Sequence, residues 1–226
     1  MKKISLLVSA IAITAIFSEC TKNKTGPNTN ATVMFVNGCA GTTGIYTKVN
    51  GNNVGPSSIN FFANSGYQNV TASSSVGINF YLTNLGTSLI NGTPALTAGS
   101  HYSVFAGGII TSPSFVPVAD DLTSPTSGNA KIRFINLSSD NLNESFSVGT
   151  QTVDSNILYT HCSPYYQVTA GAYVIKAVDP SNIPAAVITP STTLGAGKIY
   201  TVMLTGSQSA SSGSTSGLTL TIINNN

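Results

Sequence analysis

His161 and Cys162 are adjacent in the sequence, and in this pair a thiol nucleophile adjoins a base. Side chains of neighbouring residues on a strand point to opposite faces of the sheet, so an adjacent pair seldom forms a catalytic dyad. In the internal repeat described below, their positions correspond to Ala63 and Asn64, so the repeated unit does not need them. We therefore predict no catalytic residue and expect that the protein is not an enzyme.

Acidic residues are scarce, and Asp140 and Glu144 lie in the segment SSDNLNES, which also offers Asn and Ser oxygens. Calcium takes about six to eight oxygen ligands, usually with several carboxylates. Two interpretations stay open, a weak ion site and, as the favoured one, solvated turn residues. The adjacent Asp120 and Asp121 are interpreted in the same way. We predict no metal site and no cofactor, and we keep Asp140 and Glu144 as candidate ligand-binding residues.

A sugar-binding site would need an aromatic platform, and the chain contains no Trp. Exposed Tyr could substitute, and the segment SPYY offers Tyr165 and Tyr166. Because neighbours on a strand alternate, we expect Tyr165 to point inward and Tyr166 outward. Tyr166 is therefore a candidate stacking residue near the loop 137–145.

The amino end predicts export. Lys2 and Lys3 precede an almost wholly apolar run from Ile4 to Phe17. As a helix this run would rise about 21 Å, short of the roughly 30 Å hydrocarbon layer. It therefore indicates a secretory signal over residues 1–19 rather than a permanent membrane span.

The residues around Cys20 resemble a bacterial lipoprotein signal, with an apolar run, a small residue, a Cys and a polar tether over 20–30. In that class the Cys becomes the first mature residue and carries acyl chains, each buried methylene contributing about 0.8 kcal/mol. Glu19 departs from the usual pattern, and looser versions occur in lipoproteins of the Bacteroidetes type. The resemblance implies lipidation at Cys20 and a place in the bacterial cell envelope, where we expect the outer membrane. Cleavage elsewhere, or an uncleaved anchor, is the alternative.

Cys39 and Cys162 form an even pair once Cys20 is acylated, in a compartment that permits disulfides. Because they fall in different copies of the repeat, a disulfide would join the two domains. Two buried, reduced thiols are the alternative.

Charge is sparse in this chain. Charged residues make up 7% of it, against roughly a quarter in ordinary domains. The net charge of +2 comes from the leader and tether, since from Ala31 onward five Lys and Arg stand against six Asp and Glu. A nucleic-acid partner would need basic residues clustered on one face, so we expect none.

Three blocks recur in the same order, about 98 residues apart. They pair SINFFANSGYQNVTAS (58–73) with NILYTHCSPYYQVTAG (156–171), LTAGSHYSV (96–104) with LGAGKIYTV (194–202), and ATVMFVN (31–37) with AKIRFIN (130–136). This pattern indicates a tandem duplication. We predict a first repeat over 31–121, a linker LTSPTSGN over 122–129, and a second repeat over 130–226.

Alternation of apolar and polar residues predicts strands in each copy. KIRFIN places Ile132 and Phe134 on one face and Lys131 and Arg133 on the other, and INFYLT, HYSVFA and LTLTII alternate in the same way. Clusters of Gly, Pro, Asn and Ser bound these runs. The predicted fold class is all-β, with two tandem small β-sandwiches of immunoglobulin-like or transthyretin-like arrangement.

The same blocks resemble the domain-of-unknown-function family 4397 of exported bacterial proteins, which often occurs in tandem copies. The second copy carries the pattern best, through Ala130, Ile132, Arg133, Phe134, Asn136, Ser138, Tyr165, Val168, Ala170, Gly171, Leu194, Ala196, Gly197, Tyr200, Thr201 and Val202. The first copy departs at Met34, where the pattern has Arg, and at Gly38, Cys39 and Ala40. The resemblance implies an exported β domain and implies no activity.

Two functions from different classes follow. The favoured one is a non-catalytic, lipid-anchored envelope protein that serves adhesion, assembly or ligand display through the loops at the sandwich ends. The alternative is a carbohydrate-binding or carbohydrate-processing accessory lipoprotein that uses Tyr166 and the loop 137–145. The expected partners are the membrane, through the N-terminal lipid, and a glycan or an envelope protein.

Overall fold

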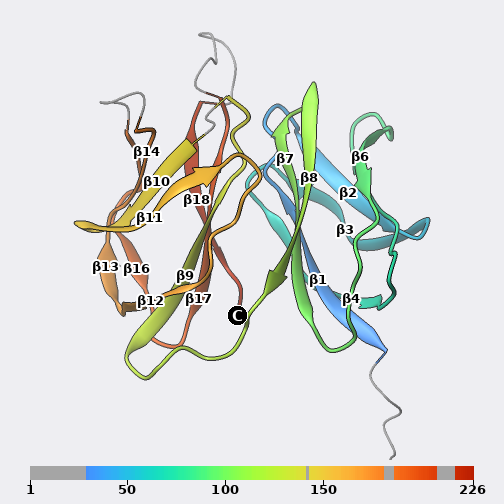
Figure 1. Cartoon of the computed structure of the whole chain (residues 1–226). Helices are drawn as coiled ribbons and strands as arrows, with labels where there is room; N and C mark the ends of the chain where they lie inside the picture. Colours follow the sequence, from blue (N-terminus) through green and yellow to red (C-terminus); the bar gives the residue numbers. More distant parts are fainter. Residues whose placement is uncertain (1–28, 141–142, 181–185, 208–216) are drawn as a thin grey trace, which may run out of the picture.

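The computed structural model describes residues 29–140, 143–180, 186–207 and 217–226, and its regular elements there are strands (Figure 1). Within these ranges, no helix has the length and apolar character that crossing a membrane would require. The predicted signal peptide, Cys20 and nearly all of the predicted tether lie outside the described residues.

Strands follow one another with short connections in both halves. The first half holds β1 (Asn30–Asn37), β2 (Gly44–Val49), β3 (Asn52–Asn60), β4 (Asn64–Thr71), β5 (Ile78–Leu82), β6 (Ser88–Gly92), β7 (His101–Ile109) and β8 (Ser112–Asp120). The second half holds β9 (Asn129–Asn136), β10 (Asn143–Val148), β11 (Gln151–Leu158), β12 (Tyr166–Thr169), β13 (Gly171–Tyr173), β14 (Ile175–Val178), β15 (Ala186–Ile188), β16 (Thr192–Leu194), β17 (Ile199–Thr205) and β18 (Thr219–Asn224).

Both halves repeat one topology. An inner sheet, β4-β1-β7-β8 or β12-β9-β17-β18, is paired with an outer sheet, β3-β2-β5-β6 or β11-β10-β14-β15. β1 runs parallel to β7, and β9 runs parallel to β17. The small sheet β13-β16 of the second half stands where the first half has an isolated bridge between Ser73 and Leu96. The prediction of an all-β fold built from small sandwiches is confirmed.

Alternating residues build a separate core between the two sheets of each half. Phe35 and Phe80 meet edge to face in the first core, with ring centroids 6.1 Å apart. Phe134 and Phe146 stack in the second core at 4.8 Å. Burying such aromatic side chains supplies much of the hydrophobic stabilisation of a small sandwich. KIRFIN behaves as its alternation predicts, since Ile132 lies in the second core.

The inner sheets of the two halves pack against each other. Figure 1 shows this contact at its centre, between the two sandwiches. A third buried cluster joins them, made of Met34, Val36, Phe105 and Val116 from the first half and Ile135, Leu137, Met203 and Ile223 from the second. The central strands of each inner sheet, β1 and β7 or β9 and β17, are therefore largely buried on both faces.

Candidate functional site

Tyrosine and amide side chains gather on the outer sheet of the first sandwich. On β2, Tyr46 and Lys48 alternate with core residues, and on β5, Asn79 and Tyr81 do the same, so all four point away from the core. The strand register places Tyr46 opposite Tyr81 and Lys48 opposite Asn79. We call this surface the tyrosine face, and its members are Tyr46, Lys48, Asn53, Asn79, Tyr81, Ser88 and Asn91.

The two tyrosine rings of this face are stacked. The ring centroids of Tyr46 and Tyr81 are 5.1 Å apart with an interplanar angle of 18°. The Lys48 ammonium lies 4.9 Å from the centroid of the Tyr81 ring, within the range of a cation–π contact. Because each ring is held by a neighbour, the pair forms a preorganised, half-exposed aromatic platform.

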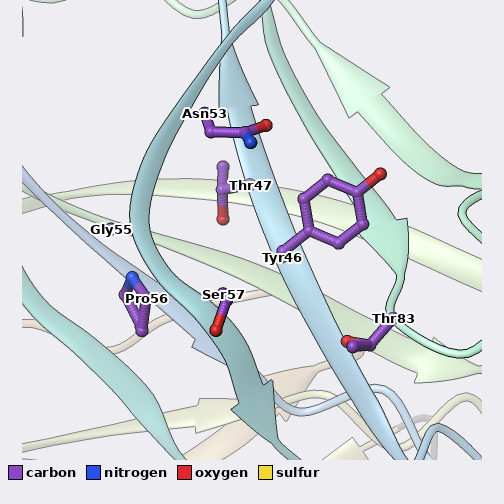
Figure 2. A pocket seen from close by; sticks show the side chains of 7 residues that line it. All are labelled: Tyr46, Thr47, Asn53, Gly55, Pro56, Ser57 and Thr83. Carbon is purple, nitrogen blue, oxygen red and sulfur yellow. The ribbon is translucent and has the colours of Figure 1, made fainter.

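A hollow of about 350 Å³ opens beside Tyr46, and Figure 2 shows the side chains around it. It arises from irregular strand pairing, because Ile45 pairs with Ile59 whereas Thr47 already pairs with Val54. β3 therefore bulges away from β2 opposite Tyr46, as β-bulges commonly do beside functional sites. The lining is Tyr46, Thr47, Asn53, Gly55, Pro56, Ser57 and Thr83.

A second hollow, of about 340 Å³, lies at the other end of the face. Its lining includes Tyr81, Lys48, Asn79 and Asn91, together with glycines of the neighbouring turns. The aromatic pair thus stands between two hollows, and asparagine side chains contribute to the lining of both.

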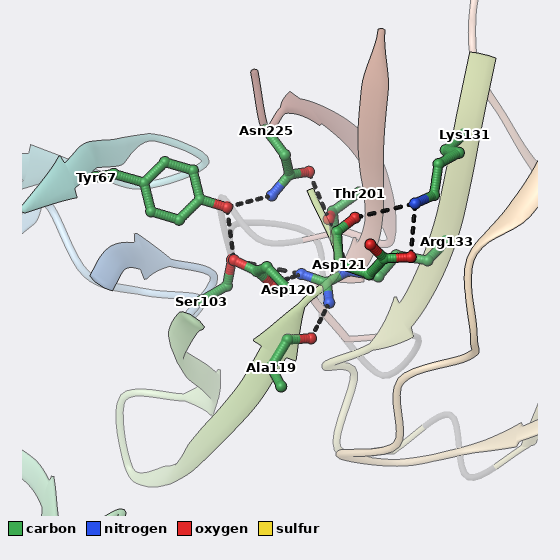
Figure 3. A network of polar contacts seen from close by, with 9 residues as sticks. All are labelled: Tyr67, Ser103, Ala119, Asp120, Asp121, Lys131, Arg133, Thr201 and Asn225. Carbon is green, nitrogen blue, oxygen red and sulfur yellow. Dashed lines mark hydrogen bonds and ion pairs between the residues drawn. The ribbon is translucent and has the colours of Figure 1, made fainter. Parts of the chain in front are cut away.

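A buried ion pair joins the two sandwiches (Figure 3). The Arg133 guanidinium, from β9, donates to the Asp120 carboxylate at the end of β8 and to the Ala119 carbonyl oxygen. The side chains of Arg133 and Asp120 are 1% and 0% exposed. An unpaired charge in such surroundings would be costly, so each residue depends on the other.

Hydroxyl and amide groups complete this network. The Asp120 carboxylate also accepts from the hydroxyls of Tyr67 at 2.6 Å and Ser103 at 2.8 Å. Arg133 Nε donates to the Thr201 hydroxyl at 2.9 Å, which in turn donates to the Asn225 side-chain oxygen. The network therefore draws on strands of both halves and fixes their relative orientation.

A hollow of about 530 Å³ borders this interface, and its lining includes Lys131, Arg133 and Tyr165. Lys131 Nζ bonds the Asp121 carboxylate at 2.6 Å and the Thr123 carbonyl oxygen at 2.9 Å. The Arg133 guanidinium carbon lies 4.6 Å from the Tyr165 ring centroid. Because both cations already have protein partners, we assign this hollow to the joint between the domains.

Tyr166 is not an outward stacking residue, so its expected orientation is wrong. Tyr166 pairs with Ile132, so it shares the face that packs against the second core, and its hydroxyl donates to Asp154 at 2.6 Å. Tyr165 instead lies beside Arg133 at the domain joint. Tyr165 thus matches its counterpart Tyr67, which also lies at this joint.

Asp140 and Glu144 lie in different surroundings. Asp140 is exposed in the turn after β9, and its carboxylate accepts from Ser138 and Ser207. Glu144 is 1% exposed on β10, where the alternation turns it inward, so its interpretation as a solvated turn residue is wrong. Asp120 also departs from that interpretation because it is buried at the domain joint. In the described ranges, no group of three or more His, Cys, Asp and Glu residues could hold a metal ion.

The two cysteines of the body are free thiols. Cys39 is fully buried in the first core, and Cys162 packs against the cluster between the domains. The alternative of two reduced thiols is therefore the one that the structure shows. His161 is exposed, whereas its neighbour Cys162 faces the interface, as expected for adjacent residues on opposite sides.

Burial raises the pKa values of several thiols and phenols. It raises the pKa of Cys39 from 9.0 to about 12 and that of Cys162 from 9.0 to about 11. Burial, helped by the hydrogen bond to Asp154, raises the pKa of Tyr166 from 10.0 to about 12. Burial also raises the pKa values of Tyr67 and Tyr165.

These shifts predict a fall in stability at high pH. Between the unfolded and folded pKa values, the unfolded chain binds fewer protons than the folded chain, so the free energy of unfolding decreases as pH rises. The stabilisation is fully present below about pH 9, the unfolded value of the thiols, and is lost toward the folded values of about 11 and 12. Thermal melts followed by circular dichroism should show Tm falling by several degrees between about pH 8.5 and about pH 11. A constant Tm over that range would contradict this prediction.

The fold and these surfaces define an all-β protein of two joined β-sandwiches with a buried ionic joint and a tyrosine-lined outer sheet. The family model described as domain of unknown function (DUF4397) matches residues 31–143, and the chain belongs to this family. The resemblance inferred from the sequence blocks is thereby confirmed. The match covers the first repeat and the start of the second, although the motifs themselves fit the second repeat better.

No curated protein matches the sequence. Among solved structures, CBMbc (family CBM26) from Eubacterium rectale Amy13K, in complex with maltoheptaose, is 8% identical with a TM-score of 0.27, covering 86% of this chain and 96% of that one. A candidate cell adhesion protein from Bacteroides uniformis is 10% identical with a TM-score of 0.25, covering 87% and 99%. At these identities and TM-scores, neither structure informs the function of this chain.

Sequence reasoning missed the tyrosine face. Its signal was present in GIYTKV and INFYLT, where Tyr46 and Tyr81 occupy the positions opposite the core residues. What the sequence lacked was the pairing of β2 with β5, which brings Tyr46 and Tyr81, 35 residues apart in the chain, onto one surface.

Proposed function

We propose that this protein is a non-catalytic, lipid-anchored protein of the bacterial cell envelope, placed in the outer membrane, where it serves adhesion, assembly or ligand display. Loops at the sandwich ends would carry the binding, and residues 141–142 of the loop 137–145 lie outside the described residues.

The engagement of the reactive groups in structural contacts supports a non-catalytic role. Asp120 is bound to Arg133, and Asp154 accepts from Tyr166. The raised pKa values of Cys39 and Cys162 keep both thiols protonated at neutral pH, whereas a nucleophilic thiol needs a lowered pKa. The pairing of these acids and the burial of these thiols are the observation that supports the non-catalytic part of the proposal.

The anchor part of the proposal rests on Cys20 and the polar run behind it. β1 begins at Asn30, so a tether from Cys20 can extend at most about 35 Å. Acyl chains at Cys20 would then hold the sandwiches near the membrane with room to meet a ligand.

Full-length protein and its Cys20→Ala variant, made in a bacterial host, test the anchor. We expect the wild-type chain to begin at an acylated Cys20 by intact mass, to partition into detergent and to fractionate with outer membranes. Cys20→Ala should lose the acyl mass and partition into the aqueous phase. Cys162→Ala is the matched control and should behave like the wild type. An equally membrane-bound Cys20→Ala variant, or a mature chain starting elsewhere, would overturn the proposal.

A further inference from the structure

We infer that the tyrosine face of the first sandwich binds a neutral polysaccharide chain, with Tyr46 and Tyr81 as the stacking residues. This inference rests on the proposed display function and names its ligand class. The carbohydrate site expected from the sequence included Tyr166. The site inferred from the structure lies instead on the outer sheet β3-β2-β5-β6 of the first sandwich.

The strand register arranges the face as two rows that cross the sheet. One row is polar and runs through Asn53, Lys48, Asn79 and Asn91. The other row is aromatic and runs through Tyr46, Tyr81 and Ser88. A pyranose ring has an apolar C–H face and a rim of hydroxyls, so aromatic and amide rows side by side match its two kinds of surface.

The hollows extend the face beyond a single sugar ring. From Tyr46 to the turn at Asn50, β2 advances about 13 Å, and a hollow lies at each end of this stretch. That length suits several linked sugars along the strand.

The charge of the face selects an uncharged ligand. Among the described residues that line the two hollows, Lys48 is the charged one, and its ammonium is held over the Tyr81 ring. A site for an anionic polymer would need several cations along its length. Asparagine amides, by contrast, can both donate to and accept from sugar hydroxyls.

The second sandwich provides an internal comparison, because it keeps the sheet and lacks the aromatic pair. Its β10–β14 pairing places Ser145 opposite Val178, where the first sandwich has Tyr46 opposite Tyr81. The pairing of β10 with β11 is irregular in the same way. There the Asp154 carboxylate accepts a hydrogen bond from the Tyr166 hydroxyl, so this side chain already has a partner within the protein. The fold therefore does not require the tyrosines, which frees them to serve a ligand.

Affinity electrophoresis of the detergent-solubilised full-length chain tests this inference. The probes are purified neutral polysaccharides (an α-glucan, a β-glucan, a mannan and a xylan), with alginate as the anionic probe. We expect at least one neutral polysaccharide to retard the wild type, with binding about tenfold weaker in Tyr46→Ala and in Tyr81→Ala. Tyr46→Phe should retain most of the binding because the ring remains.

Ser145→Ala/Val178→Ala is the matched control on the second sandwich and should bind like the wild type. Circular dichroism melts of each variant establish that it is folded before binding is measured. Retardation by alginate alone, by none of the probes, or equally in wild type and both alanine variants would overturn the inference. Since binding is measured on purified protein, this result is independent of whether Cys20 carries the anchor.

Discussion

Replacing Arg133 with methionine is expected to lower the free energy of unfolding by about 3–5 kcal/mol. The substitution leaves the fully buried Asp120 carboxylate without its cation. It also gives the second repeat the residue type that the first repeat has at the equivalent position, Met34, so the replacement suits the inner sheet sterically. Chemical denaturation followed by circular dichroism measures the change.

Two further variants separate the ionic effect from the loss of packing. Arg133→Met/Asp120→Asn removes both charges and should recover most of the lost stability, because the neutral amide can still accept from Tyr67 and Ser103. Lys131→Met breaks the neighbouring ion pair with Asp121, whose side chain is 54% exposed, and should cost no more than about 1 kcal/mol. Equal losses in Arg133→Met and in the double variant would show that the buried charge is not the cause.

Leu137→Ala is expected to cost about 2–5 kcal/mol and to separate the unfolding of the two sandwiches. Leu137 is fully buried in the cluster between the inner sheets, and its carbonyl oxygen accepts from the Gly108 N–H of the first half. A Cβ at Gly38 or Gly107 would come within 2.8 or 2.9 Å of the Leu137 side chain. The first half therefore has glycines where this leucine inserts, and truncation leaves a cavity at the joint.

Calorimetry distinguishes this effect from ordinary core damage. Each half has its own core, so weakening the joint should turn one transition into two. Leu96→Ala is the matched control, since Leu96 is 3% exposed in the first core. It should destabilise the protein to a similar extent without broadening the transition in the same way. Identical transition shapes in the two variants would refute the proposed role of Leu137.

Several structural elements could be predicted from local patterns alone. The alternation in KIRFIN placed Ile132 and Phe134 in a core, because a strand sends successive side chains to opposite faces. The recurrence at about 98 residues anticipated two halves of one topology. The same patterns could not say what covers the opposite face of that strand, where Arg133 lies.

The sequence by itself determined the all-β class, the repeated topology, the inward faces of the strands and the family, because these depend on short-range periodicity and on residues a fixed distance apart. Only the tertiary structure decided the roles of particular residues. Packing of the inner sheets turned Asp120 and Arg133 into a buried joint, the register of β12 carried Tyr166 toward a core, and the pairing of β2 with β5 stacked Tyr46 on Tyr81. These contacts join residues distant in the chain, and a one-residue change in register would send each side chain to the other face.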